Sequence, residues 1–75
     1  MIDLVRPLEE IKASGLEKYY WYFEERAAIR EFDGETARED IDRQSMNDTV
    51  YLFMEDNNLD VTSIKVNQFI KKMIL

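Results

Sequence analysis

The sequence predicts an all-α fold, a small single-domain bundle of about four helices that spans residues 1–75. Apolar residues recur at helical spacing along most of the chain. Signals for helix starts and stops divide it into segments, and no segment has a neighbour that looks like a good pairing strand. With 75 residues and no cysteine, the domain is near the lower size at which packing alone stabilises a fold.

We expect the first helix over residues 4–14, where Pro7 is tolerated in the first turn. Its apolar residues recur at helical spacing: Leu4, Leu8 and Ile11. Gly15 then offers a break, and a longer helix is expected over residues 16–33. This second helix should stop at Gly34, because glycine adopts the left-handed conformation that ends a helix at little cost.

The third segment contains a change of helical phase. The stretch Thr36–Glu39 (TARE) fits the capping-box pattern and predicts a helix over residues 36–44. Apolar residues on either side of residue 45 lie on nearly opposite faces: Ala37 and Ile41 on one, Met46, Val50 and Phe53 on the other. A break near residues 45–47 explains this and predicts a separate helix over residues 46–57. Residues 49–54 (TVYLFM) are also rich in strand-forming types, so a strand is the alternative there.

A final helix is expected over residues 62–73. The pair Asn57-Asn58 forms a turn before it, and Asp60 or Thr62 is expected to cap its first turn. One apolar stripe runs along this helix: Val66, Phe69, Ile70 and Met73.

The charge is unevenly distributed along the chain. Residues 1–60 contain all 16 acidic residues and seven of the ten basic ones, whereas residues 61–75 contain three lysines and no acidic residue. Most of the surface should therefore repel nucleic acid, and only residues 61–75 could approach it. The acidic part instead favours a protein partner with a basic surface.

The run Tyr19–Phe23 (YYWYF) holds five consecutive aromatic residues. Successive helical residues are about 100° apart, so these five sweep about 400° and cannot all face one core. The inward-facing stripe should comprise Leu16, Tyr19, Tyr20, Phe23 and Ala27. A second stripe comprises Trp21, Ala28 and Phe32, with Tyr22 and Ile29 on its flank. The second stripe is either enclosed by other helices, paired with a second copy in a homodimer, or exposed to a foreign partner.

The last of these alternatives defines a candidate protein-binding site. Tryptophan and tyrosine are enriched among residues that dominate binding energy. We therefore expect Trp21, Tyr22 and Phe32 to serve as apolar anchors. Carboxylates should surround them and meet basic residues of the partner: Glu24, Glu25, Glu31 and Asp33.

The composition argues against catalysis. Without histidine or cysteine, the usual general base, thiol nucleophile and zinc ligands are missing. The stretch Glu55–Asp60 (EDNNLD) does not fit a calcium loop, because Val61 stands where the loop needs glycine and Asn67 where it needs glutamate. The only glycines are Gly15 and Gly34, so there is no phosphate-binding loop. We predict a protein that is not an enzyme and has neither cofactor nor metal.

The expected location is the cytoplasm, without attachment to a membrane. The start of the chain lacks a basic leader followed by an apolar stretch. No run approaches the roughly 20 apolar residues that a membrane-spanning helix needs.

A helix-turn-helix DNA-binding regulator, acting as a dimer, is the alternative function. The last third of the chain has the required outline of helix, short turn and helix. Its final helix carries residue types that contact phosphates or base edges: Lys65, Asn67, Lys71 and Lys72. Three lysines neutralise few phosphates, however, and the rest of the surface is acidic.

The segment Phe23–Gly34 (FEERAAIREFDG), followed by TARED, resembles a motif in short proteins of bacterial phages and other mobile elements. In those proteins the pattern is EERAAIxExDG, followed by an acidic helix that contains alanine. The resemblance covers less than a third of the chain. It implies a phage or mobile-element origin. The motif itself carries no settled activity. Small phage proteins without catalytic residues often act by binding a host protein, so we expect inhibition of a host nucleic-acid-handling complex, as anti-CRISPR and anti-restriction proteins do.

Overall fold

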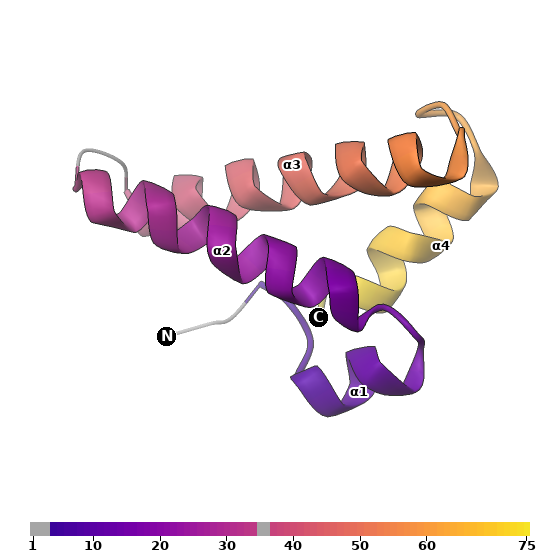
Figure 1. Cartoon of the computed structure of the whole chain (residues 1–75), viewed down its shortest axis with the longest axis horizontal. Helices are drawn as coiled ribbons and strands as arrows, with labels where there is room; N and C mark the ends of the chain where they lie inside the picture. Colours follow the sequence, from indigo (N-terminus) through magenta and orange to yellow (C-terminus); the bar gives the residue numbers. More distant parts are fainter. Residues whose placement is uncertain (1–3, 35–36) are drawn as a thin grey trace.

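Two long helices form an antiparallel hairpin that runs the length of the molecule (Figure 1). The computed structural model describes residues 4–34 and 37–75. These residues form four helices: α1 (Leu8–Ala13), α2 (Glu17–Asp33), α3 (Arg38–Asn57) and α4 (Ile64–Met73). Helix α1 lies beside the start of α2, and α4 folds back from the end of α3 (Figure 1). The predicted all-α bundle is confirmed.

The described ends of the chain pair with each other as extended segments. Val5 and Ile74 form an antiparallel β-bridge, flanked by a hydrogen bond of 2.7 Å from the Arg6 amide to the Met73 carbonyl. The prediction that the first helix begins at residue 4 is therefore wrong. Proline disfavours helical geometry in the residue before it, and Pro7 itself is extended, with ψ at 147°. The helix consequently begins only at Leu8.

The aromatic core lies where α2, α3 and α4 meet. The rings of Phe53 and Phe69 stack with their centroids 4.1 Å apart, and Tyr19 meets both rings edge-on at 5.5 and 5.1 Å. Such pairs add about 0.5–1.5 kcal/mol each beyond the burial of their area. The predicted inward stripe of α2 is confirmed: Tyr19, Phe23 and Ala27 are buried, Leu16 and Tyr20 partly so. The stripe of α4 is confirmed as well: Val66, Phe69 and Met73 are buried and Ile70 is partly buried.

Helix α3 is continuous, so the predicted break near residues 45–47 is wrong. Ser45 and Thr49 are both fully buried and belong to its inward face. Their hydroxyls are satisfied, because Ser45 accepts a hydrogen bond from Arg30 and Thr49 donates one to the Ser45 carbonyl at 2.8 Å. On the helical wheel, these two polar residues lie between the two apolar faces of the segment. The inward side of α3 is therefore one continuous wide arc. Residues 49–54 are helical.

Three turns contain the turn residues that the sequence predicts. Gly15, Gly34 and Asn58 all have positive φ, at 75°, 71° and 53°. Residue 63 rather than residue 60 or 62 caps α4, because the Ser63 hydroxyl accepts a hydrogen bond from the Lys65 amide at 3.2 Å. The predicted capping box begins at Thr36, outside the described residues, and α3 follows Ala37 without a side-chain cap.

One side of α2 is not covered by the other helices. Trp21, Ile29 and Phe32 on this side are all exposed. Within residues 4–34 and 37–75, no helix has the length and apolar character needed to cross a membrane.

Candidate protein interface

The uncovered side of α2 carries large apolar side chains. Trp21, Ile29 and Phe32 are 52%, 48% and 92% exposed, respectively. With Glu25 and Ala28, which are also exposed, they fall within an arc of about 100°. We call these five residues the outer face of α2. Glu24 and Glu31 are exposed along one flank of this face.

Trp21 is held in place before any partner arrives. Its indole N–H donates a hydrogen bond to the Glu17 carboxylate at 3.2 Å, and its ring lies edge-on to Tyr20, with centroids 5.1 Å apart. Glu17 is in turn 3.8 Å from the ammonium group of Lys12. A side chain ordered in advance loses less conformational entropy on binding. Trp21 is therefore suited to act as an anchor.

The predicted anchors are not equally available. Trp21 and Phe32 share the outer face, whereas Tyr22 is half-buried beside it. The predicted carboxylates Glu24, Glu25 and Glu31 are all exposed. The side chain of Asp33 lies outside the described part of the structure. Ile29, which the helical spacing predicts only on the flank of the second stripe, is not among the predicted anchors. Its spacing, eight residues after Trp21 and three before Phe32, is the signal that could have identified it.

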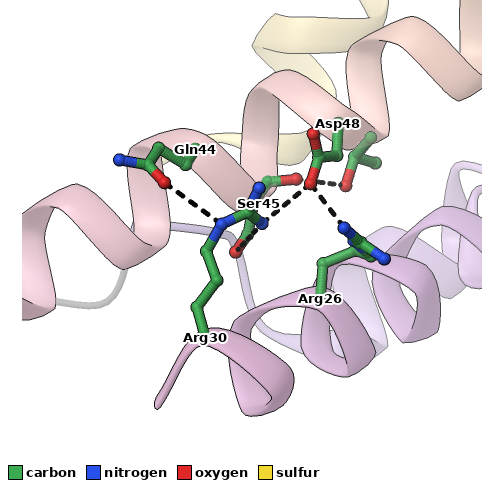
Figure 2. Close-up of polar contacts among 6 residues, drawn as sticks. Arg26, Arg30, Gln44, Ser45 and Asp48 are labelled. Carbon is green, nitrogen blue, oxygen red and sulfur yellow. Dashed lines mark hydrogen bonds and ion pairs between the residues drawn. The ribbon is translucent and has the colours of Figure 1, made fainter. Parts of the chain in front are cut away.

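The two arginines of α2 point the other way, toward α3. Figure 2 shows Arg26 and Arg30 converging on Asp48, with nitrogen–oxygen distances of 3.1 and 2.7 Å. Arg30 also donates hydrogen bonds to Gln44 and Ser45, both at 3.2 Å (Figure 2). These contacts fix the rotation of α2 about its own axis.

Lys18, the remaining basic residue of α2, also pairs with α3, although its helical position falls within the arc of the outer face and its side chain is 65% exposed. Its ammonium group lies 2.6 Å from Asp56 of α3, which also accepts a hydrogen bond of 3.0 Å from the Tyr19 hydroxyl. The hydrogen bonds from Lys18 and Tyr19 lower the pKa of Asp56. At Asp48, burial opposes ionisation, but the hydrogen bonds and charges of Arg30 and Arg26 outweigh it and lower the pKa. Both carboxylates are thus held in the charged form that binds these cations.

The charges of α2 are consequently segregated by sign. Every cation of the helix pairs with α3, while its exposed side keeps carboxylates. Glu31 is 3.2 Å from Arg38 of α3. Among the described residues, no cation lies within 4.0 Å of Glu24 or Glu25. The outer face of α2 is therefore an apolar surface bordered by negative charge.

Two grooves lie near the chain ends, and the first of them adjoins this surface, because Ala28 lines it as well. One, of about 410 Å³, lies between α2 and the extended chain ends, with Arg6, Arg38, Glu24 and Glu31 in its lining. The other, of about 780 Å³, has an apolar floor that includes Leu4, Met46 and Ile74, with Arg38, Glu39, Asp42 and Arg43 around it. Both grooves carry charges of both signs. Neither selects for the charge of a partner as the outer face of α2 does.

The residues of the DNA-binding alternative also share one exposed surface. Lys65, Asn67, Lys71 and Lys72 are all exposed on the polar side of α4. The backbone carbonyl of Lys71 accepts a hydrogen bond from the Arg6 guanidinium at 3.2 Å, which leaves the lysine ammonium group available. The polar side of α4 is therefore an exposed basic surface, whereas the outer face of α2 carries carboxylates.

No cluster of three or more metal-ligating side chains occurs among the residues that the structure describes. Searches for similar proteins return nothing that bears on these surfaces, because no protein-family model, curated protein or solved structure matches the chain.

Proposed function

We propose that this chain is a non-enzymatic, acidic binding protein that inhibits a host nucleic-acid-handling complex. In this proposal, the outer face of α2 docks on a basic surface that the host protein would otherwise use for nucleic acid. The protein is encoded by a phage or another mobile element and acts in the host cytoplasm, in the manner of an anti-CRISPR or anti-restriction protein. The motif in α2 that resembles phage proteins supports this origin.

The segregation of charge on α2 is the observation that carries the proposal. Lys18, Arg26 and Arg30 are paired with α3, so the exposed side offers apolar anchors and carboxylates together. Basic residues on the partner complement the carboxylates, and apolar residues among them complement the anchors. Charge complementarity speeds association and excludes wrong partners, and buried aromatic anchors supply most of the binding energy.

The proposal is tested with purified nucleic-acid-handling complexes. A panel of CRISPR effector complexes and restriction enzymes is mixed with the protein, and their binding to labelled DNA is measured by mobility shift. We expect the protein to block DNA binding by its target, and Trp21→Ala to weaken inhibition by about 2 kcal/mol or more, or roughly 30-fold. Tyr51→Ala is the matched control, because Tyr51 is a 68% exposed aromatic residue on α3. Equal inhibition by both variants would rule out the outer face as the binding surface.

DNA binding through α4 is a second candidate, favoured by the exposed lysines of that helix. It requires the protein itself to bind DNA, with an affinity that falls as salt rises. The two candidates depend on different helices. Substitutions in α2 and α4 therefore distinguish them.

A further inference from the structure

The outer face of α2 has a shape as well as a charge. Trp21, Ala28 and Phe32 are spaced at i, i+7 and i+11, which places them on one line about 16 Å long, parallel to the helix axis. Ala28 is exposed between two large side chains. Because its side chain is only a methyl group, the surface has a shallow depression there, between an indole and a phenyl ring.

Carboxylates border this line on both sides. Glu24 and Glu31 lie on one side of it and Glu25 on the other, because successive helical positions are about 100° apart. All three are exposed, although Glu31 pairs with Arg38. Lys18, which pairs with Asp56, lies on the same side as Glu25. The apolar centre therefore has on each side one exposed carboxylate without a cation within 4.0 Å, Glu24 on one and Glu25 on the other.

We propose that the partner presents an α-helix that lies lengthwise on this surface, with an apolar stripe against Trp21, Ala28 and Phe32 and with lysines or arginines on both sides of that stripe. This inference rests on the proposed function and names the partner element that the outer face of α2 recognises. One large apolar side chain of the partner fits over Ala28. Small residues let two helices approach within the usual 8–10 Å between axes.

A helix fits this surface better than an extended strand does. Strand addition depends on free backbone donors and acceptors, and the backbone groups within an α-helix already bond to one another. A helix needs only a complementary row of side chains. Apolar residues spaced at i, i+4, i+7 and i+11 supply a row of the required length.

A second copy of the chain does not provide such a helix. A twofold arrangement of two α2 helices would bring Glu24 and Glu25 of both copies together without a neighbouring cation to compensate them. The basic helix α4 is no better suited, because Val66, Phe69 and Met73 are already buried in its own core. A foreign basic helix satisfies both the apolar and the charge requirement.

Trp21 is the only tryptophan of the chain, so its fluorescence reports occupancy of the site directly. The full chain is titrated with three tryptophan-free synthetic peptides of 18 residues. The first places leucines in one helical stripe flanked by lysines. The second has the same composition in scrambled order, and the third replaces every lysine of the first with glutamate.

We expect the striped basic peptide to shift the emission of Trp21 to shorter wavelength and to saturate. The scrambled peptide should bind at least tenfold more weakly, and the acidic peptide should not bind. Ala28→Gln should weaken binding of the striped peptide at least fivefold, because a longer side chain fills the depression. Ala13→Gln, at an exposed alanine of α1, should leave it unchanged. Circular dichroism of both variants verifies that they fold.

Each contrary result has a definite meaning. Equal affinity for the striped and scrambled basic peptides overturns the inference of a helix but leaves a basic partner, and so the proposed function, in place. Failure of both basic peptides to bind overturns the basic partner as well. A blue shift that grows with protein concentration alone, together with a doubled mass in sedimentation, overturns the inference in favour of a second copy.

Discussion

The guanidinium group of Arg30 on α2 lies 2.7 Å from the carboxylate of Asp48 on α3. Asp48 also holds Arg26 at 3.1 Å, so a single acidic residue pairs with two cations of the neighbouring helix (Figure 2). This arrangement turns the two arginines of α2 inward. The exposure of Trp21 and of the carboxylates on the opposite side follows from it. Packing of the hairpin and formation of the candidate interface are therefore linked.

The substitution Asp48→Asn should lower the free energy of unfolding by about 1–2 kcal/mol. The substitution removes the charge that two partly buried guanidinium groups share, and hydrogen bonds to charged groups contribute about 1.5–3 kcal/mol, less some solvent screening. Urea unfolding followed by circular dichroism measures the loss. The control is Asp40→Asn, which removes a more exposed pair with Arg43 and should change stability by less than about 0.5 kcal/mol. Equal losses would mean that the Asp48 cluster is an ordinary surface pair.

The same carboxylate makes stability depend on pH in the acidic range. The pKa of Asp48 is lowered in the folded protein, while an aspartate in an unfolded chain titrates near 3.9. Below that value the unfolded chain binds the proton more readily, so the free energy of unfolding falls as pH decreases. The stabilisation from Asp48 is fully present above about pH 5 and is lost as pH falls through the folded pKa. Urea midpoints measured between pH 2.5 and 6 should decline less for Asp48→Asn than for the unaltered protein, and parallel curves would contradict this.

Helical phase was sufficient to predict the inward and outward stripes of α2 from the sequence. It failed for α3, because the inward face there includes two polar residues, Ser45 and Thr49, which are both fully buried and which a pattern of apolar residues does not count. Their burial depends on Arg30, which reaches Ser45 from a different helix. No local pattern contains that information. The segregation of charge escaped prediction for the same reason, since the partners Asp48 and Asp56 are 18 or more residues from the cations of α2 that they bind.

Two residues of the aromatic run should differ strongly in how much stability their substitution by alanine removes. Phe23 is 4% exposed and Trp21 is 52% exposed. Phe23→Ala should cost about 3–5 kcal/mol of stability, as expected for a truncated core aromatic, whereas Trp21→Ala should cost about 1 kcal/mol or less. Thermal unfolding followed by circular dichroism measures both. If Trp21→Ala melts the protein as severely as Phe23→Ala does, Trp21 belongs to the core and the candidate interface loses its anchor.

Substitution of the lysines on α4 distinguishes the two candidate functions. Replacing Lys65, Lys71 and Lys72 together by glutamine should leave inhibition of the target complex unchanged, because these side chains lie on a different helix from Trp21. The unaltered protein should show no binding to a labelled duplex at 150 mM salt, since an acidic surface opposes phosphate and three lysines release few counterions. Fluorescence anisotropy over a range of salt concentrations tests this. Duplex binding that weakens with a slope of about −3 in log K against log salt, and that disappears in the triple variant, would instead assign the protein to the DNA-binding class.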